Sequence, residues 1–115
     1  MKLYKLLSTC CACCLVWFQL SAQSVVTFKV EDVVLPAGYS VGIRGNSAPL
    51  SWDRSISLEK NANGYYTTLS FPGAVKMIEF KFVTFKNDQN PNWESIENRT
   101  LDLSTSDTLT SSNIW

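Results

Sequence analysis

The sequence contains no histidine, and its four cysteines all lie in one apolar run between Cys10 and Cys14. From residue 23 onward the chain therefore has neither the most common general base nor a thiol nucleophile, and it lacks the usual ligands of a zinc or copper site. None of its serines occupies a nucleophile elbow. These absences predict a protein that is not an enzyme and that holds no metal ion and no cofactor.

The N-terminal segment has the three parts of a secretory signal peptide. Lys2 and Lys5 supply positive charge, residues 6–20 are uncharged, and small residues ending at Ala22 follow. We expect cleavage after Ala22, export to the periplasm or the exterior, and no membrane contact afterwards, because the run is too short and too early for a stable spanning helix. A lipid-anchoring cysteine at Cys10 is a weaker alternative, since a bulky threonine precedes it and only a very short apolar stretch would remain.

Positive charge is scarce in the rest of the chain. Residues 23–115 carry eight Lys and Arg against ten Asp and Glu, a net charge of about −2. A nucleic acid or an anionic membrane is therefore not an expected partner, because both require a basic footprint. The length and the 45% hydrophobic content suffice for one domain with a real core, and we expect that domain to span residues 23–115 without the help of a disulfide.

Apolar and polar residues alternate along most of the chain, with turn residues between the runs. The expected strands cover residues 25–31, 39–45, 56–58, 65–71, 77–86, 101–103 and 109–115. They recur at intervals of about 8 to 12 residues, and no helical period interrupts them. The pattern predicts an all-β fold: an antiparallel β-sandwich of about seven to eight short strands with an immunoglobulin-like arrangement.

The longest expected strand, residues 77–86, places a lysine on the outside of the sandwich. Ile78, Phe80 and Phe82 share one face of this strand. Lys81 lies on the opposite face, together with residues 79, 83 and 85, because successive side chains in a strand point to opposite sides.

Two tryptophans lie in turn-like sequence rather than in alternating strands. Trp52 follows a stretch rich in Asn, Ser and Pro, and Trp93 follows the polar residues 87–92. Such a tryptophan can fold back as a lid over the core, because Trp is highly buried on average. Alternatively, its flat indole can stack on the apolar face of a pyranose while nearby polar groups bond the hydroxyls. Two such residues favour a binding site.

The acidic residues are weaker indicators of function. Glu94 and Glu97 have the side chains of a glycosidase acid pair, but closely spaced acids in one loop are usually a solvated surface. Residues 87–92 are rich in Asn and Asp yet lack the ligand alternation of a calcium loop. We expect a polar surface in both places.

Four segments together resemble the starch-binding domains of carbohydrate-binding module family 20. They are GNSAPLSW at 45–52, IEFKF at 78–82, WESIENR at 93–99 and the closing IW at 114–115. The most specific element is the aromatic-Lys-Phe strand followed, twelve residues after Lys81, by the W-E-x-x-x-N-R motif. The resemblance covers essentially all of residues 23–115 in the right order.

The resemblance implies a non-catalytic module that binds α-1,4-glucan such as starch, glycogen or malto-oligosaccharides. Its site would consist of Trp52 and Trp93 as stacking platforms, with Lys81, Glu94 and Asn98 orienting the sugar through charge-assisted hydrogen bonds. Two indoles set at an angle would suit the curved face of a helical α-glucan. A catalytic domain would be a covalent partner if the module is the front end of a longer secreted enzyme.

A second glucan site of the family is not expected in this chain. That site uses tyrosines in the loops before the second and the fourth strand. Here the first position falls near Ala37, with Tyr39 displaced, and Lys60 to Gly64 contains no aromatic residue. Tyr65 is expected to pack in the core instead.

The alternative function is that of a scaffold. The same sandwich could orient a neighbouring domain or contact another protein without binding sugar. The two tryptophans discriminate between these functions: exposure of Trp52 and Trp93 on one surface favours sugar binding, and burial in the core favours the scaffold.

Overall fold

The computed structural model describes residues 22–115, and the predicted signal peptide lies outside this part except for its last residue. Within it the chain forms the strands β1 (Gln23–Glu31), β2 (Ser40–Gly45), β3 (Ile56–Ser57), β4 (Glu59–Lys60), β5 (Tyr65–Pro72), β6 (Met77–Phe85), β7 (Asn92–Trp93), β8 (Arg99–Asp102) and β9 (Thr108–Ile114). In these residues no helix is long and apolar enough to span a membrane.

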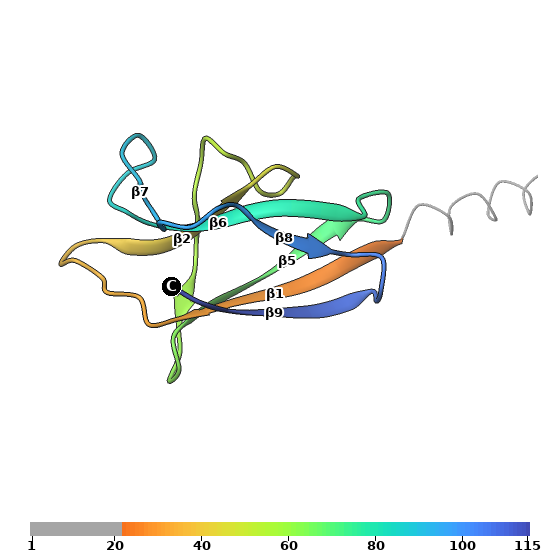
Figure 1. Cartoon of the computed structure of the whole chain (residues 1–115), viewed down its shortest axis with the longest axis horizontal. Helices are drawn as coiled ribbons and strands as arrows, with labels where there is room; N and C mark the ends of the chain where they lie inside the picture. The colour runs from red at the N-terminus through yellow and green to blue at the C-terminus, as the bar shows by residue number, and fades with distance from the viewer. Residues whose placement is uncertain (1–21) are drawn as a thin grey trace, which may run out of the picture.

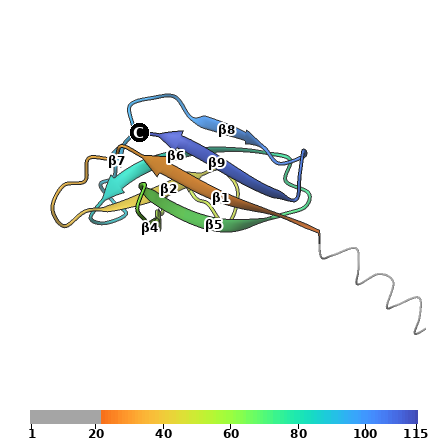
Figure 2. The same ribbon diagram turned by 90° about the horizontal axis from the view of Figure 1, so that it is seen from below.

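The strands form two sheets that face each other. Sheet A has the strand order β4-β5-β1-β9, and sheet B has the order β3-β2-β6-β7, with β8 also pairing with β6. Figure 1 shows β2 and β6 in one layer and β1 and β9 in the other, and Figure 2 shows β5, β1 and β9 side by side. The predicted all-β sandwich is confirmed.

The observed strands differ from the prediction in two respects. β4 and β7 contain two residues each, too few for an alternating pattern to reveal them. β1 and β9 pair in parallel, with Val25 opposite Thr108 and Glu31 opposite Ile114, whereas the other strand pairs are antiparallel. The first and last strands of the domain thus run side by side in the same direction.

The core lies between the sheets and is built on the inward positions of β1, β2, β5 and β6. Phe28 of β1 is its centre: the ring packs edge-on against Phe80 at 5.0 Å and against Phe71 at 6.2 Å between centroids. Full burial of each such aromatic side chain contributes on the order of 2 to 3 kcal/mol to folding. Tyr65 packs against this cluster, as expected, and so does Trp115.

The outward face of sheet B is partly covered by its own loops. Val83 occupies an outward position of β6 yet is fully buried, which alternation alone does not predict. On the neighbouring strand a Cβ on Gly42 would lie 2.7 Å from a ring carbon of Phe85, so the ring fits only over a glycine. This face therefore carries a thin second layer, and the candidate site is built on it.

Candidate functional site

Trp52 and Trp93 meet over the outward face of sheet B. Their ring centroids are 6.1 Å apart, and the planes of the rings are inclined by 50°. Trp52 lies between β2 and β3 and is half-buried, whereas Trp93 is 41% exposed. Trp93 belongs to the short strand β7, opposite Val83, and not to a loop as predicted. The pairing of β7 with β6 fixes the backbone that carries this indole.

A hollow of about 390 Å³ opens beside the two indoles, and its lining consists of Trp52, Lys81, Trp93 and Asn98. Lys81 comes from β6, and its Nζ lies 6.0 Å from the ring centroid of Trp93. Asn98 is exposed and ends the segment between β7 and β8. Four of the five predicted site residues are thus brought together from three separate stretches of the chain.

Glu94 is the exception among the predicted site residues. Its side chain is 2% exposed and forms an ion pair with Arg99, with Oε1 and Nη2 2.8 Å apart. Its Oε2 accepts a hydrogen bond from the backbone N–H of Phe82 at 2.8 Å, and its own N–H donates to the carbonyl of Phe82. The expectation that the carboxylate of Glu94 bonds the sugar is therefore corrected: both of its oxygens already bind groups of the domain itself, Arg99 and the N–H of Phe82.

This position of Glu94 also removes the acid pair considered in the sequence. Glu97 is exposed, whereas Glu94 is buried and bonded to Arg99. An acid pair that cleaves a glycosidic bond needs both carboxyl groups facing the substrate. The hollow between the tryptophans is lined by neither of them.

Among residues 22–115, two titratable groups have shifted pKa values, and both lie away from the hollow. The hydroxyl of Tyr66 donates to Glu59 at 2.7 Å, and this bond to a carboxylate raises the pKa of Tyr66. Hydrogen bonds from Ser104 lower the pKa of Asp102. Both shifts arise from local hydrogen bonds at the surface, and neither group lines the hollow beside the tryptophan pair.

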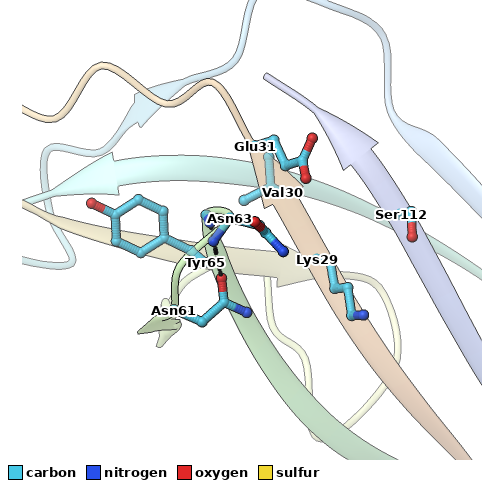
Figure 3. A pocket seen from close by; sticks show the side chains of 8 residues that line it. Lys29, Val30, Glu31, Asn61, Asn63, Tyr65 and Ser112 are labelled. Atoms are coloured by element: carbon cyan, nitrogen blue, oxygen red, sulfur yellow. Dashed lines mark hydrogen bonds between the residues drawn. The ribbon is translucent and has the colours of Figure 1, made fainter.

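A second pocket lies at the turn between β4 and β5 (Figure 3). It is lined by Lys29, Val30, Glu31, Asn61, Asn63, Gly64, Tyr65 and Ser112. The amide oxygen of Asn61 accepts hydrogen bonds from two backbone N–H groups of the turn, and so part of the polar lining is already satisfied. The aromatic residue of this lining, Tyr65, packs against the core. The pocket has no tilted aromatic pair like that of Trp52 and Trp93.

Arg44 is the residue at the site that sequence reasoning missed. It stands at an outward position of β2, opposite Lys81, and is nevertheless only 3% exposed. Its guanidinium lies 5.4 Å from the ring centroid of Trp93. The available signal was an arginine directly before the GNSAPLSW segment, on the same face as Lys81.

Comparison with known proteins decides the family. The family model of the starch binding domain matches residues 23–113, nearly the whole described chain. The chain belongs to this family, carbohydrate-binding module family 20. The starch-binding domain predicted from the tryptophan and lysine motifs is thereby confirmed.

Solved structures share the fold of this starch-binding domain. A family 15 glucoamylase from Hypocrea jecorina matches with a TM-score of 0.66 at 20% identity, over 84% of the chain and 18% of that enzyme. The gamma-CGTase from alkalophilic Bacillus clarkii matches with a TM-score of 0.67 at 24% identity, over 81% of the chain and 15% of that enzyme. The chain thus corresponds to less than a fifth of either protein.

An isolated module matches over its whole length. The family 20 module of the maltotetraose-forming amylase from Pseudomonas saccharophila STB07 has a TM-score of 0.58 and 18% identity, over 79% of this chain and 99% of that module. At such identities these structures show the shared sandwich fold of the domain.

Proposed function

We propose that this starch-binding domain holds α-1,4-glucan by stacking glucose rings on Trp52 and Trp93. The observation that carries the proposal is the tilted pair itself: two indoles 6.1 Å apart, inclined by 50° and lining one open hollow. An indole face is apolar and complements the C–H face of a pyranose. Because consecutive glucose units of an α-1,4-glucan turn relative to one another, inclined platforms match two units of a curved chain.

The polar groups of the hollow supply orientation. Lys81 brings three N–H donors, and Asn98 brings an amide that both donates and accepts. Both side chains line the hollow next to the indoles. Sugar hydroxyls act as donors and acceptors too, so this pair fixes the register of the chain while stacking contributes most of the affinity.

The scaffold alternative is less well supported by the surface. A tryptophan that serves only the core is expected to be covered, whereas Trp93 is 41% exposed and shares the rim of a hollow with Trp52. Exposed tryptophans are rare on surfaces that bind nothing. Sugar binding accounts for this exposure together with the tilt of the two rings and the hollow that they line.

The proposal includes the setting of the domain. We propose export to the periplasm or the exterior after loss of residues 1–22, and action as a binding module without catalysis of its own. The two enzymes that contain matching modules support a role beside a catalytic domain that acts on α-glucans. In that role the module raises the local concentration of the insoluble substrate.

Adsorption to insoluble polysaccharides tests this function directly. The purified protein is expected to sediment with granular starch, to remain in solution with cellulose or chitin, and to be released from starch by soluble β-cyclodextrin. The reason is the tilt of the indoles, since flat cellulose calls for coplanar platforms. Equal adsorption to all three polymers, or to none, would refute selective recognition of α-glucan.

Catalysis is expected to be absent. No reducing sugar should be released from starch, maltoheptaose or β-cyclodextrin, because Glu94 is buried and the hollow is lined by no carboxylate. The assay compares the wild-type protein with Glu97→Gln, the variant that removes the exposed acid of the loop. Release that scales with protein and disappears in Glu97→Gln would show an enzyme.

A further inference from the structure

Arg44 is a buried cation at the base of the tryptophan pair. Its side chain is 4% exposed, while its ionic partner Asp88 is 47% exposed and 3.6 Å away. Arginine is almost never so deeply buried unless its charge is paired. Lys81 lies directly opposite on β6, and like charges in that position destabilise a sheet. Two unfavourable features thus meet at one residue next to the binding site.

The guanidinium joins the two segments that carry the tryptophans. Nη1 donates to the carbonyl of Trp52 at 2.7 Å, and Nη2 donates to the carbonyl of Asp88 at 2.7 Å. Nε donates to Oγ of Ser55 at 2.9 Å. The backbone N–H of Ser55 donates in turn to Oδ1 of Asp88. One planar side chain therefore ties the segment of Trp52 to the segment that precedes Trp93.

The same group also contacts the second indole. The guanidinium carbon lies 5.4 Å from the ring centroid of Trp93, within the range of a cation–π interaction. Arg44 thus holds the backbone of Trp52 by a hydrogen bond and the ring of Trp93 by its charge. These attachments and the pairing of β7 with β6 thus act on the two segments whose rings are inclined by 50°.

Stability alone does not explain this arrangement. A buried charge loses its hydration, and replacement of a buried ion pair by apolar side chains of similar size is often neutral or stabilising. An apolar residue, however, would leave both tryptophan segments without a common anchor. The fixed planar fork of arginine imposes distances and directions that a flexible lysine does not impose.

We infer that Arg44 is a positioning residue that sets the angle between Trp52 and Trp93 and thereby the preference of the site for glucans of fixed curvature. The inference rests on the proposed function. A cyclic glucan such as β-cyclodextrin has a rigid curvature and needs the platforms at the correct angle. A linear chain such as maltoheptaose can adapt to altered platforms, because its glycosidic bonds rotate.

The test compares three variants by titration calorimetry with both sugars. Arg44→Lys keeps the positive charge and loses the planar guanidinium with its set of N–H donors. Ser55→Ala removes the hydroxyl that accepts the hydrogen bond from Nε, without any change of charge. Arg54→Lys is the matched control, since Arg54 is exposed in the same segment. Near-ultraviolet circular dichroism of the unliganded proteins reports the mutual orientation of the tryptophans.

Arg44→Lys is expected to bind β-cyclodextrin about tenfold more weakly, the size of one lost charge-assisted hydrogen bond, and to bind maltoheptaose about threefold more weakly or less. Ser55→Ala should show a smaller loss of affinity, again greater for β-cyclodextrin than for maltoheptaose. The tryptophan dichroism should change in Arg44→Lys and stay unchanged in Arg54→Lys. The ratio of the affinities for β-cyclodextrin and maltoheptaose is decisive, because a general loss of stability weakens the binding of both sugars alike.

An unchanged affinity ratio in Arg44→Lys, or an unchanged tryptophan spectrum, would overturn the positioning role. If Arg44→Lys fails to fold, a normal affinity ratio in Ser55→Ala overturns it, and a shifted ratio supports it. Failure of the wild-type protein to bind either sugar would refute the proposed function instead. In that case the near-ultraviolet spectra by themselves would decide whether Arg44 positions the tryptophans.

Discussion

Replacement of Trp93 or Trp52 by alanine is expected to weaken the binding of β-cyclodextrin or maltoheptaose roughly tenfold to a hundredfold while the domain stays folded. Each indole gives up a hydrated apolar face to a sugar, which is worth roughly 1.5 to 3 kcal/mol, and 1.4 kcal/mol corresponds to about a factor of ten in affinity. The free energy of unfolding should fall by only about 1 kcal/mol in Trp93→Ala, because Trp93 is 41% exposed, and by about 2 kcal/mol in Trp52→Ala, because Trp52 is half-buried. Isothermal titration and a melting curve of each variant measure the two effects.

Tyr66→Ala is the matched control for the tryptophan variants. Tyr66 lies on β5 in sheet A, away from the hollow, and its hydroxyl bonds Glu59. It should bind glucan with wild-type affinity. The stacking site is disproved if both tryptophan variants bind normally. It is also disproved if both lose about 3 to 5 kcal/mol in the free energy of unfolding, the loss typical of a truncated core aromatic.

Glu94→Ala is expected to lower the free energy of unfolding by about 3 kcal/mol, the largest effect on stability of any acidic residue near the site. The substitution leaves the N–H of Phe82 without its acceptor and the guanidinium of Arg99 without its carboxylate. Breaking a buried ion pair from one side costs about 3 to 5 kcal/mol, and we take the lower value because the side chain of Arg99 is 19% exposed. In a domain of this size the melting temperature should fall by more than ~10 °C.

The neighbouring Glu97→Ala provides the comparison, since Glu97 is exposed in the same segment. It should change the free energy of unfolding by no more than about 0.5 kcal/mol. The double variant Glu94→Leu, Arg99→Met should lose less stability than the two single variants added together, because neither charge is left alone. A fully stable Glu94→Ala would contradict the structural role and return Glu94 to the set of sugar ligands.

The faces of the strands could be derived from the sequence because alternation is a local property. Alternation places Phe80 and Phe82 of β6 on the face opposite Lys81, and both are buried in the core. Lys81 was assigned to the outside by the same rule and lines the hollow. The spacing between Lys81 and the W-E-x-x-x-N-R motif is also local, and it indicates the family that the match over residues 23–113 shows.

Burial of charge could not be derived in this way. Glu94 follows a polar stretch and was expected to be exposed, yet Arg99 from the same segment and the N–H of Phe82, twelve residues away, both reach its carboxylate. Arg44 stands at an outward position of β2, where alternation indicates exposure, yet it is buried. Its burial requires Asp88, which is 44 residues away.

By itself the sequence determined the fold class and the core faces of the long strands, and it singled out the four residues that line the hollow of the candidate site. Only the tertiary structure decided the parallel pairing of β1 with β9, the inclination of the two indoles and the partners of Glu94 and Arg44. The reason is physical: the period of a strand is set by adjacent residues, whereas a buried charge is stabilised by groups that only the folded chain brings within hydrogen-bonding distance.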